Sequence, residues 1–384
     1  MKSLRLVCLI SYLFLLAVLI LISKSAQSAS APTPAATVPI EPNSCTIPQF
    51  IDISNANEQD DPATDGRYIV WSEFVNPFGP ELPAVLDLGP DGIFGTPDDG
   101  GKSYLQTPYA ANYTLRIDNG RIVWRAGNSY PFFEAILTCT MPACITNPPT
   151  TLLTAPPQLN SIFVDVDVYQ NRIAYIQRVG GPSTKIGIYD LTNNTNTIIF
   201  QGGFSNSIDL EGDLIAWQHF PYTGYKSDIL VYNLLTNQTI NITGSPNETD
   251  LLPKLSQYPS NDIYLLGFTK NNNYAAYTFI INGVPLSLNI IPNAAGIGDV
   301  EIKSPADLRI STMTYNSGSI PVLKKASPPY AAGINWTDYL VPLPNLPSPL
   351  VWGTYGGIIS HGDTVILNQL LLNGYTKLSI SQCP

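Results

Sequence analysis

The sequence is poor in charged residues, which make up 12% of it and about half the usual share. Lys, Glu and Arg favour helices, so their scarcity predicts almost no helix after residue 30. The chain has 19 basic against 29 acidic residues. The resulting net charge of −10 argues against a nucleic-acid partner, which would need a basic face. The same balance disfavours binding to anionic lipid surfaces.

Histidine is almost absent as well. The two histidines, His219 and His361, lie far apart in the sequence. A metal site built on several histidines, as some lyases use, needs more than the chain contains. No Gly-x-Ser-x-Gly segment is present, so the nucleophile turn of many hydrolases is missing. We interpret both histidines as strand-end polar residues, and the composition leans away from an enzyme.

The N-terminus predicts export. Residues 1–28 have a charged start, an apolar run from Leu6 to Ile22 and small residues after it, as a signal peptide does. A retained signal anchor is the alternative, because the run reaches the lower limit for spanning a bilayer. Residues 29–44, rich in Pro, Ala, Ser and Thr, are expected to be a linker. Residues 45–384 are then secreted, periplasmic or on the cell surface.

After residue 45 the chain repeats a turn, an alternating apolar strand and a final aromatic residue. The aromatic residues follow one another at 53, 51 and 42 residues: Trp71, Trp124, Tyr175 and Trp217. Strand-like repeats with periods of about 40–50 residues are typical of a β-propeller. Aromatic residues at equivalent positions indicate packing between blades. We therefore predict an all-β fold with a single propeller over residues 45–384.

We count seven repeats, each expected to form one four-stranded blade. Residues 161–202 show the unit clearly, as four apolar segments separated by turns. Six blades is the alternative, if the Pro-rich region 296–350 is an insertion. The last repeat has only three evident strands. Ile47–Ile53 is therefore predicted to supply its fourth strand and close the ring.

Four of the five cysteines are predicted to pair. Cys45 and Cys383 flank the two segments expected to meet in the last blade, so a disulfide there would lock the ring in an oxidising compartment. Cys139 and Cys144 are predicted to staple a hairpin tip. A metal or redox motif is the alternative for this second pair, but it has no partnering histidine. Cys8 lies in the signal.

The repeats follow the pattern turn–Gly–x–Ile–x–Trp, then Asp–Ile–x–x–Tyr–Asp/Asn–Leu, then a Thr/Asn turn. The matching segments are Asp65–Trp71, Asn119–Trp124, Lys185–Leu191 and Ser227–Leu234. In this the chain resembles the TolB-like β-propeller repeat family of exported prokaryotic proteins, over residues 59–256 and more loosely to 384. The resemblance implies a scaffold for protein or glycan contacts.

An acidic, glycine-rich loop is a candidate calcium site. Its carboxylates are Asp87, Asp91, Asp98 and Asp99, and three glycines lie among them. Ca²⁺ takes six to eight oxygen ligands from folded loops of this kind. The spacing differs from that of an EF-hand, and two β-turns with solvated carboxylates are the alternative.

Three further carboxylates are candidate catalytic residues. Asp165, Asp167 and Asp209 lie on expected first strands, which line the channel of a propeller. Glycoside hydrolysis needs two carboxylates across the sugar bond, so a carbohydrate-active hydrolase or lyase is one hypothesis. The alternative, which we favour, is that these residues face turns or water beside the axis.

Surface features favour a binding role. Five aromatic residues in or beside Pro-rich loops are candidates for stacking on sugars or partner chains: Tyr330, Trp336, Tyr339, Trp352 and Tyr355. Six Asn-x-Thr sequons are candidate glycosylation sites: Asn112, Asn193, Asn237, Asn241, Asn247 and Asn335. We interpret the chain as an exported, non-enzymatic protein- or glycan-binding module. A hydrolase or lyase, or a structural envelope component, are the alternatives.

Overall fold

The computed structural model describes residues 44–51, 57–74, 79–129, 132–156, 161–181, 183–221, 226–244, 248–258, 262–271, 273–291, 293–304, 307–314, 321–326, 334, 336–341, 352–371 and 376–383. All of them belong to one compact unit, residues 43–384, so the expected signal and most of the linker lie outside the described residues. The helical content of this part is one 3₁₀ turn, η1 (Ala143–Ile145). It contains no helix long and apolar enough to cross a membrane.

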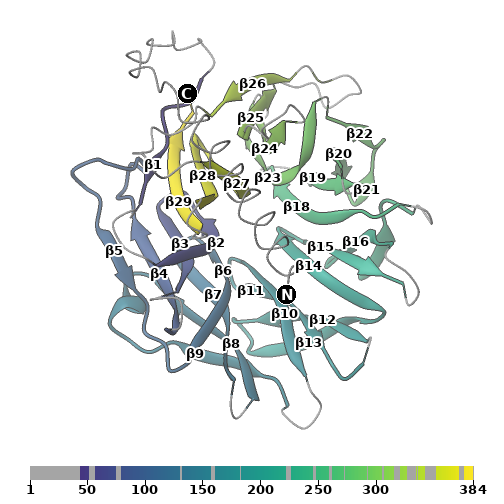
Figure 1. The fold of residues 1–384 in the computed structure, drawn as a ribbon. Coiled ribbons are helices and arrows are strands. Elements are labelled where there is room, and N and C mark those ends of the chain that lie inside the picture. Colours follow the sequence, from purple (N-terminus) through teal and green to yellow (C-terminus); the bar gives the residue numbers. More distant parts are fainter. Residues whose placement is uncertain are drawn as a thin grey trace, which may run out of the picture. The chain divides into compact units, whose positions relative to one another are not determined.

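Seven antiparallel sheets form the blades of a β-propeller (Figure 1). The first blade is β2 (Glu58–Thr64), β3 (Tyr68–Phe74), β4 (Glu81–Asp87) and β5 (Gly101–Tyr104). The second is β6 (Ala111–Asp118), β7 (Arg121–Ser129), β8 (Phe132–Thr140) and β9 (Thr150–Thr154). The third is β10 (Ile162–Tyr169), β11 (Arg172–Arg178), β12 (Thr184–Asp190) and β13 (Thr195–Gly202). The predicted four-stranded unit is confirmed.

The remaining blades follow the same order from the inside outwards. The fourth is β14 (Phe204–Glu211), β15 (Leu214–Phe220), β16 (Asp228–Asn233) and β17 (Gln238–Asn241). The fifth is β18 (Leu251–Gln257), β19 (Ile263–Lys270) and β20 (Tyr274–Ile281), with its outer edge divided into β21 (Val284–Pro285) and β22 (Asn289–Ile290). The sixth is β23 (Ala294–Ser304), β24 (Asp307–Thr314), β25 (Pro321–Ala326) and β26 (Thr337–Leu340). Because 296–350 contains most of this sixth blade, the six-bladed alternative is wrong.

The seventh blade joins the two ends of the unit. It contains β27 (Trp352–His361), β28 (Thr364–Leu371) and β29 (Thr376–Gln382), and its outermost strand is β1 (Gln49–Phe50). Figure 1 shows the purple β1 beside the yellow β29. The predicted closure by Ile47–Ile53 is confirmed, although the paired strand is only two residues long.

Further bonds extend this short strand. The Thr46 backbone N–H donates to the Gln382 carbonyl at 2.7 Å, and the Ile51 N–H donates to the Leu378 carbonyl at 3.1 Å. The Cys45 N–H donates to the Leu340 carbonyl at the end of β26, at 3.0 Å. The N-terminal segment therefore connects the seventh blade to the sixth as well as completing its sheet.

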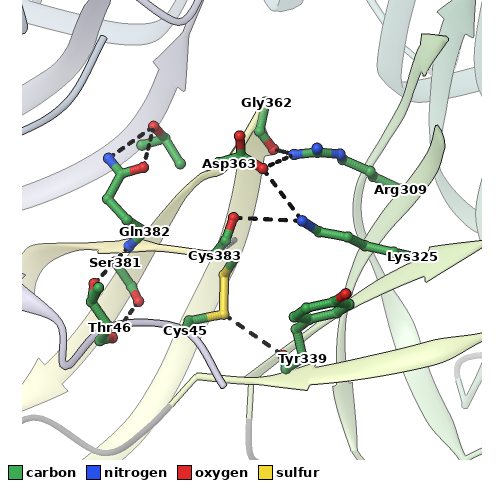
Figure 2. Close-up of a disulfide and its surroundings, with 11 residues drawn as sticks. Cys45, Thr46, Arg309, Lys325, Tyr339, Gly362, Asp363, Ser381, Gln382 and Cys383 are labelled. Atoms are coloured by element: carbon green, nitrogen blue, oxygen red, sulfur yellow. Dashed lines mark hydrogen bonds and ion pairs between the residues drawn. A yellow bond between two sulfur atoms is a disulfide. The ribbon is translucent and has the colours of Figure 1, made fainter. Parts of the chain in front are cut away.

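Both predicted disulfides are present. Cys45 and Cys383 are bonded across the closing seam, and Cys139 is bonded to Cys144 beside η1. Around the first pair, Figure 2 shows Asp363 between the cations of Arg309 and Lys325, at 2.8 and 3.3 Å. Two disulfides in one domain are consistent with an oxidising compartment.

The repeated aromatic residues lie in the core between blades, as predicted. Trp71, Trp124, Tyr175 and Trp217 are all almost fully buried on the second strands. Each belongs to a cluster that includes side chains of the preceding blade; Trp217, for example, shares one with Ile176 and Ile186. The 40–50-residue period of the sequence is thus the period of blade-to-blade packing.

Removing the Cys45–Cys383 disulfide should destabilise the fold more than removing the other. It closes a 338-residue separation, for which chain entropy gives an upper value of about 5–6 kcal/mol, against about 2 kcal/mol for the five-residue separation of Cys139–Cys144. Denaturant titration of the Cys45→Ser/Cys383→Ser and Cys139→Ser/Cys144→Ser variants measures both losses. Equal losses would contradict a role for the first disulfide in closing the ring.

Candidate functional site

The seven innermost strands surround a central cavity of about 760 Å³. Its lining is strongly acidic, because every innermost strand except those of the fifth and seventh blades contributes at least one carboxylate. The acidic lining residues are Asp60, Asp61, Asp65, Asp118, Asp167, Asp209, Glu211, Asp299 and Glu301. Two cationic residues, Arg116 and Lys254, also line it, together with His361. The cavity therefore brings nine carboxyl groups, two cations and one histidine together.

A β-bulge interrupts the pairing of every innermost strand with its neighbour. In three blades a non-glycine residue at the bulge has positive φ: Asp61, Thr114 and Leu252. Such a conformation costs of order 1 kcal/mol and is found preferentially at functional sites. Bulges also re-aim side chains, so they change which residues face the cavity from one blade to the next.

Most of the acidic side chains are engaged in hydrogen bonds between blades. A carboxylate on one blade accepts the backbone N–H of the next at five of the seven seams, with distances from 2.5 to 3.4 Å. These pairs are Asp65 with Gly120, Asp118 with Gln170, Asp165 with Ile208, Asp167 with Leu210, Asp209 with Leu255, Asp299 with Ser360 and Glu301 with Gly362. We call these the inter-blade carboxylate bonds.

The other two seams use neutral acceptors in the same way. Ser256 Oγ accepts the Ile302 N–H between the fifth and sixth blades, at 2.9 Å. At the closing seam Gln59 Oε1 accepts the Leu378 N–H at 3.0 Å. Because the same type of bond recurs around the ring, its first role is to hold adjacent blades in register.

Burial changes the charge state of several of these carboxyl groups. Burial, with the nearby charge of Asp209, raises the pKa of Asp167 to about 8. Burial also raises the pKa of Asp299 to about 6, although Lys254 opposes the shift. The pKa of Glu211 is raised well above its ordinary value by burial and by Asp209. Part of the acidic lining is therefore protonated at neutral pH.

The two cations of the cavity are paired with carboxylates. Lys254 Nζ lies 3.2 Å from Asp209, and Arg116 lies 3.7 Å from Asp165. Burial lowers the pKa of Lys254, but the charges of Asp209, Asp299 and Asp167 together more than offset this and leave it raised. Both cations thus neutralise carboxylates on neighbouring blades.

The structure places the three candidate catalytic residues in this network. Asp167 and Asp209 line the cavity, whereas Asp165 pairs with Arg116 and is not part of the lining. All three accept backbone N–H groups of the following blade. They hold blades together, with the raised pKa of Asp167 as the one feature typical of a reactive pair.

The two histidines are not brought together in the cavity. His361 lines it at the end of β27. His219 is half-buried in the fourth blade, where its ring contacts Phe200 edge-on at 5.1 Å between centroids. Burial lowers the pKa of His219. The structure therefore offers no paired use for these residues.

In the acidic loop the carboxylates accept hydrogen bonds from the loop itself. Asp87 pairs with Arg67 at 3.1 Å, Asp91 accepts the Ile93 N–H, Asp98 accepts the Thr96 hydroxyl and Asp99 accepts the Gly95 N–H. Within the described ranges, no three His, Cys, Asp or Glu residues are grouped to hold a metal ion. Calcium binding at this loop stays a prediction.

The candidate surface aromatics are dispersed. Trp336 packs edge-on against Tyr277 at 5.6 Å, beside the core of the fifth and sixth blades. Tyr339 lies under the Lys325 ammonium at 4.6 Å. Tyr330 lies outside the described residues, as do the side chains of Trp352 and Tyr355 in β27.

The sequons also differ from one another. Asn193, Asn237 and Asn241 are exposed, whereas Asn247 and Asn335 lie outside the described residues. Asn112 is fully buried, and its amide donates to the Glu81 carbonyl at 2.7 Å. A glycan on that nitrogen has no room in the fold, so the prediction for Asn112 is wrong.

Sequence reasoning missed most of the cavity lining. Arg116, Lys254 and Asp299 are not marked by any motif, and Asp60 and Asp61 precede the first recognised repeat phrase. An alignment of the first strand of every repeat, rather than of the aromatic strand, would have placed these lining residues in one group.

Comparisons with known proteins support the fold alone. No protein-family model matches the sequence, and no curated protein is similar to it. Among solved structures, an oligogalacturonate lyase in complex with manganese has a TM-score of 0.56 at 9% identity, covering 89% of this chain and 98% of that one. The RRP9 WD40 repeats have a TM-score of 0.55 at 10% identity, covering 88% of this chain and 100% of theirs.

A third similar structure is the β-propeller domain of the trilobed protease from Pyrococcus furiosus. Its TM-score is 0.54 at 12% identity, covering 87% of this chain and 98% of that one, and it is described as having an open velcro topology. TolB from Acinetobacter baumannii has a TM-score of 0.41 at 12% identity, covering 68% of this chain and 64% of that one. The fold is that of a β-propeller, and the TolB-like family stays a prediction.

The raised pKa of Asp167 predicts a specific pH dependence of stability. A carboxyl group whose pKa is higher in the folded than in the unfolded state stabilises the fold at low pH, and this contribution is lost as pH rises from about 4 to about 8. Asp167→Asn keeps an oxygen for the Leu210 N–H but cannot ionise. Its melting temperature should therefore fall less than that of the wild type between pH 5 and pH 9, by about 2 °C or more.

Thermal melts followed by circular dichroism across this pH range measure the difference. The control is Asp190→Asn, a half-buried residue of the same blade whose pKa is lowered by bonds from Thr192 and Asn193. This variant should keep the wild-type slope between pH 5 and pH 9. Identical slopes for Asp167→Asn and the wild type would show that Asp167 is ionised in the fold at neutral pH.

Proposed function

We propose that this protein is an exported, non-enzymatic interaction module whose central cavity binds a basic segment of a partner protein. The observation that supports this most is the charge of the cavity: nine acidic residues line it against two cationic ones. Its volume of about 760 Å³ lies within the range of about 300–1,000 Å³ typical of ligand sites. A cavity of this charge attracts Lys and Arg side chains and repels anionic ligands.

Not all of the lining is occupied by structural bonds. Asp61 is exposed to the cavity, and its side chain accepts no hydrogen bond from the described residues. Asn368 borders the same region and donates to Asp60 at 2.5 Å, while its own carboxamide oxygen is buried without a partner in the described part. Asp60, Asp61 and Asn368 therefore form the part of the lining best able to receive a cation.

A carbohydrate-active hydrolase or lyase is the second candidate. It is favoured by one observation, the raised pKa of Asp167 beside Asp209 in the central cavity. We rank it second because both carboxylates accept backbone N–H groups that recur around the ring. If the enzyme hypothesis is correct, the chain will cleave an oligosaccharide, and Asp209→Asn will abolish that cleavage.

Export is supported by the N-terminal apolar run and by two disulfides, and it would put the module in the periplasm, on the cell surface or in the medium.

Calcium at the acidic loop is a separate proposal. It requires that Ca²⁺ titrated into the protein gives heat and raises the melting temperature, and that Asp98→Asn removes both effects.

The cavity proposal predicts selective binding of cations. A tetralysine peptide should bind, and the Asp60→Asn/Asp61→Asn variant should bind it about tenfold more weakly, since each exposed ion pair contributes up to about 1 kcal/mol. Added salt should weaken the wild-type interaction. Isothermal titration calorimetry measures both effects.

The control is Asp91→Asn/Asp99→Asn, which makes the same charge change in the acidic loop. It should bind tetralysine as the wild type does. Equal loss in both variants would indicate non-specific attraction to an acidic protein, and binding of neutral oligosaccharides alone would indicate a glycan site instead. Either result contradicts the proposal.

A further inference from the structure

Two of the innermost strands, β2 and β18, have the same bulge. The pairing of β2 with β3 shifts within residues 60–63, and the pairing of β18 with β19 shifts within residues 251–254. Asp61 and Leu252 are the second residue of each shift, and both have positive φ, at 49° and 52°. The two residues therefore occupy equivalent positions on the first and fifth blades.

This backbone conformation is unfavourable for both residues. Positive φ is uncommon outside glycine and is a genuine outlier for a bulky side chain such as that of Leu252. A proline follows each residue, Pro62 and Pro253, and a residue before proline is restricted to extended conformations. Strain of this kind persists only where the surrounding structure imposes it, and it gathers at sites that hold ligands.

Both strained residues present their side chains to the central cavity. Asp61 and Leu252 line it, and both are exposed, Leu252 by 47%. At the equivalent bulges of the second and sixth blades, Thr114 is buried and Gly296 has no side chain. Aliphatic surface in contact with water is unfavourable, and a ligand that covers it gains free energy. Leu252 is therefore available to a ligand.

The order of the blades puts these two residues on nearly opposite sides of the cavity. The first and fifth blades are separated by two blades in one direction around the ring and by three in the other (Figure 1). Beside Asp61 the lining includes Asp60 and Asn368, which are bonded to each other. Beside the fifth blade, the sixth adds the cross-strand pair of Ala295 and Met313. One side is thus acidic and the opposite side apolar.

We propose that the cavity recognises a segment in which a lysine or arginine lies beside an aliphatic residue. The cation is held at Asp61, and the aliphatic side chain packs against Leu252. This inference rests on the proposed function and adds a second feature to the ligand. A basic segment without an aliphatic residue leaves Leu252 in water, so Leu252 selects among basic segments.

The test is isothermal titration calorimetry with two capped tetrapeptides of equal charge. One alternates lysine with leucine, and the other alternates lysine with serine. The wild type should bind the leucine peptide about five- to tenfold more tightly, because contact with the peptide buries the exposed part of Leu252. Asp61→Asn should weaken the binding of both peptides and keep the preference.

Leu252→Asn is the decisive variant. Asparagine adopts positive φ more readily than leucine does, so this variant should keep the wild-type melting temperature. It should bind the serine peptide as the wild type does and lose the preference for leucine. The matched control is Leu235→Asn, since Leu235 is 68% exposed and is not among the residues that line the cavity. This control should keep the preference.

The possible failures are distinguishable. If the wild type binds neither peptide, the proposed function falls and this inference falls with it. If both peptides bind with equal affinity, or if Leu252→Asn keeps the preference, only this inference is overturned and the binding of basic segments stands. A clearly lower melting temperature of Leu252→Asn would also overturn it, because Leu252 would then serve the stability of the fold.

Discussion

The hydrogen bonds from one blade to the backbone of the next are the interaction on which the rest of this structure depends. A blade alone has an apolar face on each side and cannot bury both. The inter-blade carboxylate bonds fix the register in which those faces meet, so that Trp124 and Trp217 fit the cores of the preceding blades. They also place carboxylates around the axis, which makes the cavity acidic.

The same interaction limits what the cavity can do chemically. A carboxylate that accepts a backbone N–H is held in place, and its pKa responds to burial and to its neighbours. Asp167 and Asp209 have this structural role in common with Asp118 and Glu301, which have equivalent bonds on other blades. The acidity at the axis is therefore mainly a consequence of the bonds that hold adjacent blades together. In the proposed function, binding uses the remaining groups, such as Asp61.

Much of the fold was predictable, because packing between successive blades requires similar residues at intervals of about 40–50 residues in the sequence. The aromatic residues, the seven repeats, the closing strand and both disulfides followed from that period and from cysteine placement. The cavity was not predictable in the same way. Its lining depends on bulges at residues such as Thr114 and Leu252. These residues have positive φ, and no local sequence pattern predicts that conformation for them. Asn112 was mistaken for a surface residue because it is buried by contacts with the neighbouring blade, which its local sequence does not show.

The most direct test is native-state hydrogen exchange of the amides that donate to carboxylates, at Ile208, Leu210 and Leu255. If these bonds hold the ring, the three amides will be as protected as those in the centre of β15. Asp209→Ala will then release Leu255 and leave Ile208 protected. Rapid exchange of all three in the wild type would contradict the account, because the blades would then be held in register without these bonds.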